Sequence, residues 1–272
     1  GVNLHYGSEV QDPETLAASA DLLVASDGLN SQTRRQYEPH FKPDVEMRKC
    51  RFIWLGSTKL LDAFTFAFRQ TEHGWFALHA YRFNDTHSTF IIETPEDVWE
   101  KHGIAQMEQA ESIRFCEQLF ADILDGHSLI SNARHLRGSA VWIKFPRVLC
   151  RQWHHRNIVL IGDAAHAMLP NAGQGACQAF EDSYILGRWL STARDPVEAF
   201  ENFRRVRIPR VQGVQRLSLS NARFKHMRDA SAQKDAIAAG TGSVHGTSEW
   251  VWGFDPVGEW NKDPVVPSVY AA

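Results

Sequence analysis

The stretch "IGDAAHAMLPNAGQGACQAFED", residues 161–182, decides how this chain is expected to fold. It starts within the apolar run "NIVLIGD" (157–163), which is typical of a buried parallel strand. Asp163 is therefore expected at the carboxyl end of a strand, where open α/β sheets bind their ligands. Gly173 and Gly175 follow, at the start of a helix expected over about 174–192, and glycine lets a ligand approach the backbone closely.

These two points of the chain suit a ligand with a polyol at one end and an electron-rich ring at the other. A carboxylate such as Asp163 accepts hydrogen bonds from ligand hydroxyls, and a helix N-terminus favours negative charge. A flavin nucleotide has both features. The alternative is a purely structural role, in which strand, loop and helix pack closely and Asp163 caps a turn, and the spacing alone leaves both readings open.

The rest of the chain predicts two kinds of sheet. "ADLLVASDG" (20–28) is a second apolar strand that stops at Asp27-Gly28. Between 46 and 94 the apolar residues alternate, which predicts an antiparallel meander with Trp75, His79 and Tyr81 on one face of a strand. "TPEDVWEKHG" (94–103) predicts a short helix capped by Thr94. A long helix is expected from 196 to about 228.

Composition excludes several classes of function. The 272 residues carry a net charge of −3, so nothing global points to nucleic acid or a membrane. The four cysteines form no CxxC pair and the thirteen histidines no HExxH motif, so we expect buried, reduced thiols, a cytoplasmic location and no metal site. The basic run 203–216 has an apolar stripe at helical spacing, and we interpret its arginines as a solvated face or as contacts within the flavin domain.

Two motifs give the chain a family resemblance. "RNIVLIGDAAHAMLPNAGQGACQAFED" (156–182) resembles the GD motif of the single-component, group A, FAD-dependent aromatic hydroxylases, and "DLLVASDGLNSQTR" (21–34) resembles their DG motif. The segment 51–94 is similar to the branch that contains salicylyl-CoA hydroxylase. Residues from 167 onward look more like the salicylate hydroxylase branch. The two branch signals disagree, so the resemblance leaves the substrate open between a salicylate-like compound and an aryl-CoA.

The resemblance implies an α/β fold with an incomplete FAD-binding, glutathione-reductase-like Rossmann-type domain, an antiparallel β-sheet substrate domain and a long C-terminal helix. We expect a partial FAD-binding domain at 1–45, the substrate domain at 46–150, the FAD-binding domain continued at 151–230 and a tail at 231–272. The family's N-terminal GxGxxG segment is not found, because "GTGSVHG" (240–246) has the wrong glycine spacing. The chain also begins at Gly1 as if within a strand, so we expect a fragment, or a partner chain that supplies the missing segment.

The resemblance also implies a role for each motif residue. Asp163, after Gly162, would bind the ribityl chain of FAD, and Pro170 would lie near the reacting carbon of the flavin. Asp27 and Gly28 would support the pyrophosphate, and Arg34 would organise their loop. The residues expected to face the flavin ring are Gly173, Gln174, Gly175 and Ala176. His166 would organise a loop rather than act as an acid or base.

The reaction implied is the hydroxylation of a small aromatic compound by O2, with NADH or NADPH reducing FAD and a flavin hydroperoxide transferring one oxygen atom. His79 and Tyr81 are the candidates for contacting the substrate; the alternative is that their face only packs or meets solvent. For an aryl-CoA, Arg48, Lys49 and Arg51 could form a basic entrance, although surface charge explains them equally well. The competing hypothesis for the whole chain is a truncated remnant or split subunit that keeps the fold without catalysing the reaction alone.

Overall fold

A computed structural model of the chain describes residues 1–131, 142–225, 251 and 254–257. Most of the predicted tail (231–272), and the end of the long helix beyond 225, lie outside these described residues. The chain divides into two compact units. Unit 1 contains Gly1–Glu46, Pro146–Ser220 and His245–Ala272, and unit 2 contains Met47–Phe145 and Asn221–Val244. The boundaries expected from the sequence were 45/46 and 150/151.

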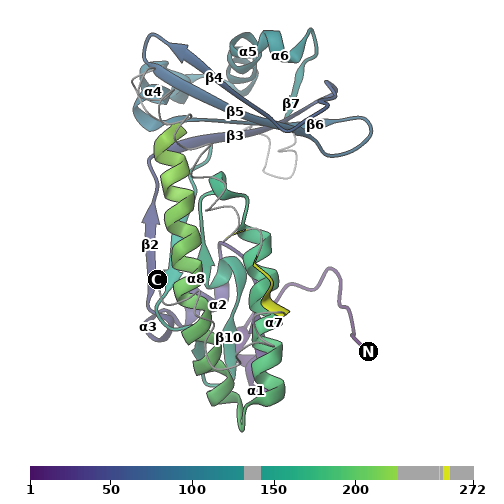
Figure 1. Cartoon of the computed structure of the whole chain (residues 1–272), viewed down its shortest axis with the longest axis vertical. Helices are drawn as coiled ribbons and strands as arrows, with labels where there is room; N and C mark the ends of the chain where they lie inside the picture. Colours follow the sequence, from purple (N-terminus) through teal and green to yellow (C-terminus); the bar gives the residue numbers. More distant parts are fainter. Residues whose placement is uncertain (132–141, 226–250, 252–253, 258–272) are drawn as a thin grey trace. The chain divides into compact units, whose positions relative to one another are not determined.

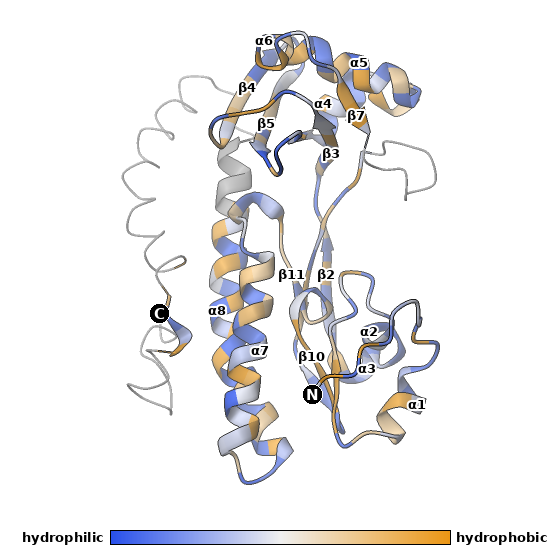
Figure 2. Cartoon of the chain, turned by 90° about the vertical axis from the view of Figure 1, so that its right-hand side faces the viewer, coloured by the Kyte–Doolittle hydropathy of each residue, from blue (hydrophilic) through white to orange (hydrophobic). Residues whose placement is uncertain are grey.

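Unit 1 is built on two small sheets with helices on both sides (Figure 2). In the first sheet β1 (Leu23–Ala25) pairs in parallel with β10 (Ile158–Leu160), and β9 (His154–His155) joins β10 on its other side. In the second, β8 (Pro146–Cys150) lies between β11 (His166–Ala167) and β2 (Pro43–Met47). Parallel β1 and β10 confirm that the two apolar runs belong to one α/β sheet, although both strands are shorter than predicted.

Helices α7 (Gly175–Thr192) and α8 (Pro196–Lys225) run side by side in unit 1, while α1 (Pro13–Ala18), α2 (Gln32–Gln36) and α3 (Glu38–Phe41) lie on the opposite side of the strands (Figures 1 and 2). Asp195 starts α8 as expected, because its carboxylate accepts the Glu198 N–H at 2.9 Å. The apolar stripe of α8 packs into the core through Phe203 and Val211, which are fully buried. Both helices confirm the sequence prediction.

Unit 2 is a five-stranded sheet in the order β4-β5-β6-β3-β7, and every described strand pair in it is antiparallel. Its strands are β3 (Cys50–Ser57), β4 (Thr65–Thr71), β5 (Gly74–Arg82), β6 (Ser88–Pro95) and β7 (Leu129–Ser131). Successive β4, β5 and β6 confirm the predicted meander. Figure 1 shows the helices α4 (Glu96–Lys101), α5 (Gln109–Leu119) and α6 (Ala121–Leu124) over one face of this sheet.

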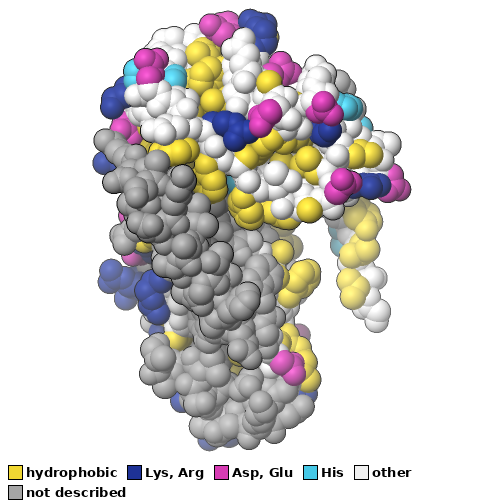
Figure 3. All heavy atoms as spheres, turned by 45° about the horizontal axis from the view of Figure 1, so that its top comes forward, with side chains coloured by type: hydrophobic (Ala, Val, Ile, Leu, Met, Phe, Trp, Pro, Cys, Tyr) yellow, Lys and Arg dark blue, Asp and Glu magenta, His cyan; other side chains and the backbone are white. Residues whose placement is uncertain are grey.

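The alternation within β5 gives unit 2 its core. Phe76, Leu78 and Ala80 point toward the helices and pack with Cys116 and Phe120, all of them fully buried. Ion pairs such as Arg69–Asp122 and Lys59–Asp125 lie at the surface of this unit, where Figure 3 shows charged side chains among hydrophobic ones. None of the helices within the described residues combines the length and apolar character needed to cross a bilayer.

The helix predicted within 94–103 is present, but its predicted cap at Thr94 was wrong. Thr94 is still part of β6, and its hydroxyl donates a hydrogen bond to the Trp75 carbonyl oxygen at 2.8 Å. α4 begins at Glu96 after Pro95, without a side-chain cap. Strand pairing therefore takes up the residue that the local pattern predicted as the helix cap. The expectation of buried thiols holds for Cys50, Cys116 and Cys150, whereas Cys177 is half-buried, and all four are free.

Candidate functional site

The loop after β1 is held by the carboxylate of Asp27. Asp27 accepts a hydrogen bond from the Ser31 hydroxyl at 2.6 Å and from the Thr33 N–H at 3.0 Å. Desolvation raises the pKa of Asp27, but these hydrogen bonds outweigh it and lower the pKa below its usual value. Gly28 has a φ of +76°, a conformation that a residue with a Cβ rarely adopts. The DG motif is therefore a preorganised turn.

Arg34 ties this turn to the GD motif. Its buried guanidinium donates to the carbonyl oxygens of Asp163 at 3.2 Å and Ala164 at 2.9 Å, and also to the Leu29 carbonyl. One side chain thus holds two loops that lie about 130 residues apart in the sequence. All three of these acceptors are backbone carbonyl oxygens, so in the described residues the Arg34 guanidinium joins the two loops.

The GD motif itself bends sharply at the end of β10. Gly162 has a φ of +58°, and a Cβ there would lie 3.2 Å from the Cβ of Ala179 in α7. The turn leaves the Asp163 side chain exposed, while the protein around its carboxylate raises its pKa by desolvation, opposed by the charges of His166 and Arg34. An exposed acceptor beside a tightly packed glycine is the arrangement expected for binding a ligand hydroxyl.

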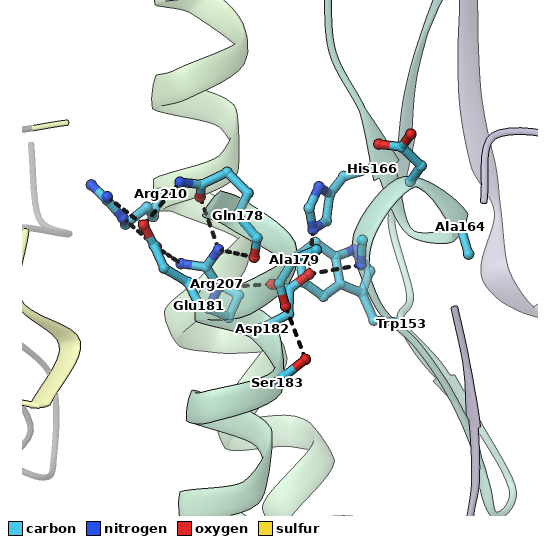
Figure 4. A network of polar contacts seen from close by, with 12 residues as sticks. Trp153, Ala164, His166, Gln178, Ala179, Glu181, Asp182, Ser183, Arg207 and Arg210 are labelled. Atoms are coloured by element: carbon cyan, nitrogen blue, oxygen red, sulfur yellow. Dashed lines mark hydrogen bonds and ion pairs between the residues drawn. The ribbon is translucent and has the colours of Figure 1, made fainter. Parts of the chain in front are cut away.

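A buried network of ion pairs and hydrogen bonds holds this bend from the side of α7 (Figure 4). The Asp182 carboxylate accepts the Gly162 N–H at 2.8 Å, the ring Nε2 of His166 at 2.6 Å and the Arg207 Nε at 2.8 Å. Burial raises the pKa of Asp182, but the charges and hydrogen bonds of His166 and Arg207 lower it overall. His166 is itself buried and packs against the Trp153 ring, which supports its predicted role as a loop-organising residue.

The network continues along the interface between α7 and α8. Glu181 receives hydrogen bonds from Arg210 Nε and Nη2, both at 2.6 Å, and from Arg207. Gln178 contacts Arg207 through its side-chain oxygen at 2.8 Å. The interpretation of the arginines in 203–216 left two alternatives, and each holds for some of them. Arg205 and Arg216 are exposed, whereas Arg207 and Arg210 are 0% and 1% exposed and make contacts within unit 1.

The N-terminus of α7 has the features that a flavin ring requires. Gly173 has a φ of +63°, and the space around a Cβ at Gly175 is open. Gln174 is 1% exposed, and its buried Nε2 has no hydrogen-bond partner within the part of the chain that the structure describes. A helix of 18 residues places its positive dipole end here. These residues would fit FAD, because glycines permit close approach of a ligand and a helix N-terminus favours negative charge.

Unit 2 contributes a different chemical surface on the face of its sheet opposite the helices. His79 in β5 and Glu93 in β6 form a pair, with Nε2 and Oε1 3.1 Å apart and Glu93 fully buried. Register places Phe66 and Ile91 beside His79, and Phe52 and Ala77 beside Glu93. The sheet therefore holds an imidazole and a carboxylate among aromatic and apolar side chains.

Aromatic side chains extend this face toward the end of β5. Tyr81 stacks on Phe64 with the ring centroids 4.9 Å apart, and Phe64 also contacts Phe66. Phe64 and Phe66 are 56% and 57% exposed, which is unusual for two neighbouring phenylalanines. Trp54 donates its indole N–H to the Thr89 hydroxyl at 2.6 Å on the same face.

The structure brings together most of the residues that the sequence singled out. Through Arg34 and Asp182 it joins the DG turn, the GD bend and α7, while Pro170 starts the short 3-10 helix η4 (Pro170–Ala172) that leads to Gly173. His79 and Tyr81 share one face in unit 2. Sequence reasoning missed Glu93, Glu181 and Arg207. A charged residue inside an otherwise apolar strand, "STFIIETP" in β6, was the available signal for Glu93.

Comparison with known proteins supplies the family. A family model described as an FAD binding domain matches residues 6–216. Salicyloyl-CoA 5-hydroxylase of Streptomyces sp is 34% identical over 232 residues, which cover 81% of this chain and 44% of that protein. Protodeoxyviolaceinate monooxygenase of Chromobacterium violaceum is 28% identical over 213 residues, covering 78% of this chain and 56% of that protein.

The fold agrees with that of solved flavoproteins. The crystal structure of Klebsiella pneumoniae HpxO complexed with FAD and uric acid aligns with a TM-score of 0.57 at 19% identity, over 83% of this chain and 58% of that one. The chain spans about half the length of the curated relatives it matches. The match to the FAD binding domain covers most of the chain, and the chain therefore belongs to this family.

Proposed function

We propose that this chain provides the flavin-facing and substrate-facing parts of an FAD-dependent monooxygenase that uses NADH or NADPH to hydroxylate a small aromatic compound. The observation that carries the proposal is the pairing of an exposed Asp163 with the glycine-flanked N-terminus of α7, because one loop positions both. When bound, FAD would accept electrons from NAD(P)H and activate O2. The residues of this chain would bind the flavin, orient the substrate and shield both from water.

Each residue at this edge of unit 1 has a distinct proposed task. Asp163 accepts hydrogen bonds from the ribityl hydroxyls, and Gly162 gives the bend that exposes it. Gly173, Gln174, Gly175 and Ala176 offer backbone and side-chain donors to the ring. Pro170 starts η4 and would shape the loop that leads from Asp163 to the helix N-terminus. Asp27 and Gly28 support the pyrophosphate end, and Arg34 keeps both loops in register.

The aromatic face of unit 2 is the proposed substrate wall. An aromatic substrate packs on such a surface, and a ring hydroxyl or carboxylate needs a polar partner there. His79 is the candidate because Glu93 fixes its Nε2, and Tyr81 is the second because it is half-buried on the same face and stacks on Phe64. Salicylate and salicyloyl-CoA are the substrates to test, as the name of the Streptomyces relative suggests. Arg51 adds no support for the CoA entrance, since its guanidinium pairs with Glu96 and stacks over Trp99.

A partner segment is part of the proposal. β1 is an end strand of its sheet in the described residues, and Val24 in its centre is 39% exposed. Backbone groups at such an edge pair readily with another strand. We propose that a further strand, supplied by a partner chain or by sequence outside these 272 residues, completes the FAD site. Free thiols and the use of NAD(P)H are in keeping with a cytoplasmic location.

An FAD titration of the purified chain, followed by desalting and absorbance spectroscopy, tests the proposal. We expect retained FAD with a shifted spectrum, and then salicylate- or salicyloyl-CoA-dependent oxidation of NADH or NADPH with a hydroxylated product. FAD retention without any turnover favours the split-subunit alternative. Failure to bind FAD at tens of micromolar, roughly −6 kcal/mol, contradicts the proposed function for this polypeptide.

A further inference from the structure

Asp182 connects the two halves of the proposed flavin site. It lies in α7, the same helix whose N-terminus at Gly175 faces the ring, and it accepts the N–H of Gly162, next to Asp163. A helix of 18 residues behaves as a rigid rod, so the Asp182 contact sets the separation between Asp163 and Gly175. The bond joins a neutral N–H to a carboxylate, which makes it stronger than a bond between neutral groups.

Arg207 orients the Asp182 carboxylate from the neighbouring helix. The Arg207 Nε binds Oδ1 at 2.8 Å, while Gly162 N–H and His166 Nε2 share Oδ2. With Oδ1 occupied, Oδ2 remains directed at the bend. Because Arg207 also donates to Gln178 and Glu181, its guanidinium is held in one position between α7 and α8.

We infer that Asp182 and Arg207 are positioning residues of the flavin site: their buried ion pair holds the Gly162 backbone so that Asp163 and the N-terminus of α7 keep the separation that FAD needs. The inference rests on the proposed function for its ligand but on the described contacts for its geometry. Neither residue touches the ligand itself. This positioning role can be told from a general stabilising role, because the same helix interface contains a second buried pair, Glu181–Arg210, that does not contact Gly162 within the described residues.

The second pair, Glu181–Arg210, supplies the control. Arg210 joins α8 to α7 through Glu181, and its described contacts include neither Asp182 nor Gly162. Because Glu181 also binds Arg207, the control changes Arg210 and leaves Glu181 in place. Replacing Asp182 by Asn keeps the shape but leaves one acceptor oxygen where the carboxylate has two. That oxygen cannot serve both Arg207 and Gly162. Replacing Arg210 by Gln disrupts the neighbouring ion pair without changing Asp182 or Arg207.

The experiment compares Asp182→Asn with Arg210→Gln by two readouts. Amide exchange of Gly162, followed by NMR on 15N-glycine-labelled apoprotein, reports the bend without any ligand. FAD titration gives the Kd of the proposed flavin site. For Asp182→Asn we expect Gly162 exchange to quicken and the FAD Kd to rise by about tenfold or more, the loss typical of a hydrogen bond to a charged group. For Arg210→Gln we expect both values to stay within about threefold.

The outcomes separate the inference from the proposed function. Unchanged Gly162 exchange in Asp182→Asn overturns the inference, and so does an equal rise of the FAD Kd in both variants. If the wild-type chain binds no FAD, the proposed function fails, while Gly162 exchange still decides the geometry. Should Asp182→Asn not fold, Arg207→Gln takes its place with the same expected direction, because it keeps the Asp182 carboxylate and removes the Nε donor that orients it.

Discussion

The imidazole Nε2 of His79 lies 3.1 Å from Oε1 of Glu93, and the Glu93 carboxylate is fully shielded from solvent. Glu93 also lies 4.0 Å from the thiol sulfur of Cys50 through its other oxygen. A carboxylate is rarely buried in a sheet unless partners compensate its lost hydration. The pair therefore fixes the ring of His79 on the aromatic face of unit 2.

Replacing Glu93 by Ala is expected to destabilise the chain. The change leaves the His79 Nε2 without this partner and opens a cavity under the sheet, so the free energy of unfolding should fall by about 1–3 kcal/mol. Urea denaturation followed by tryptophan fluorescence measures it. Glu72→Ala, which removes an exposed carboxylate near His73, should change stability by less than about 0.5 kcal/mol. Equal effects of the two substitutions would show that the buried pair is unimportant.

Replacing His79 by Asn tests the substrate wall. With FAD bound, salicylate affinity measured by the flavin difference spectrum should weaken about tenfold, because one hydrogen bond to a charged group is lost. FAD affinity should not change, since His79 lies in unit 2. His87→Asn, in the turn before β6, is the control. Unchanged salicylate binding in His79→Asn would remove His79 from the proposed site.

Asp163 is expected to matter for FAD and not for stability. Its carboxylate is exposed, so Asp163→Ala should leave the melting temperature nearly unchanged, while the FAD Kd rises by about tenfold or more through loss of charge-assisted hydrogen bonds. Isothermal titration and differential scanning fluorimetry give the two values. Asp62→Ala, an exposed carboxylate in unit 2, should alter neither. A wild-type Kd for Asp163→Ala contradicts the ribityl assignment.

Two glycine substitutions should separate folding from ligand approach. Gly162→Ala forces a Cβ into left-handed backbone 3.2 Å from Ala179 and should cost about 1–2 kcal/mol of stability. Gly175→Ala adds a methyl group to open space in a helix and should stabilise the apoprotein by about 0.5–1 kcal/mol. If the ring approaches Gly175, the same variant binds FAD more weakly. A stabilised variant with unchanged FAD affinity would show that the ligand lies elsewhere.

The chain should lose stability in mild acid. Burial lowers the pKa of His102, His154 and His155 in the folded state, and the charge of His40 lowers that of His155 further. The unfolded chain, with histidine pKa values near 6.5, then binds more protons. Stability is therefore full above about pH 6.5 and falls as the pH drops from there to the lower pKa values of the folded state. Urea midpoints at about pH 7.5 and about pH 5.5 should show the decrease. His155→Gln should make it smaller; an unchanged difference would contradict the assignment.

Local sequence identified the apolar strands, the meander and the two long helices, but not the short elements α1, α2 and α3 or the long-range polar partners. Alternation in β5 and the apolar run before Gly162 identified strands because burial imposes those periods directly. Thr94 was assigned to a helix because its cap pattern is local, whereas its strand partner Trp75 is distant. Arg207 could not be told from a surface arginine, since only the folded helix pair shows Asp182 beside it. A single sequence contains no signal for that contact.

Strands β2 and β8 are neighbours in one sheet of unit 1, joined by Arg147 in β8 to Asp44 and Glu46 in β2. The chain leaves unit 1 after Glu46 and returns at Pro146, so its exit and its re-entry lie on adjacent strands. In topological terms Met47–Phe145, the first segment of unit 2, is an insertion between two paired strands. Because its two junctions lie side by side, such an insertion can be replaced while the β1–β10 pair and the Arg34 contacts stay as they are.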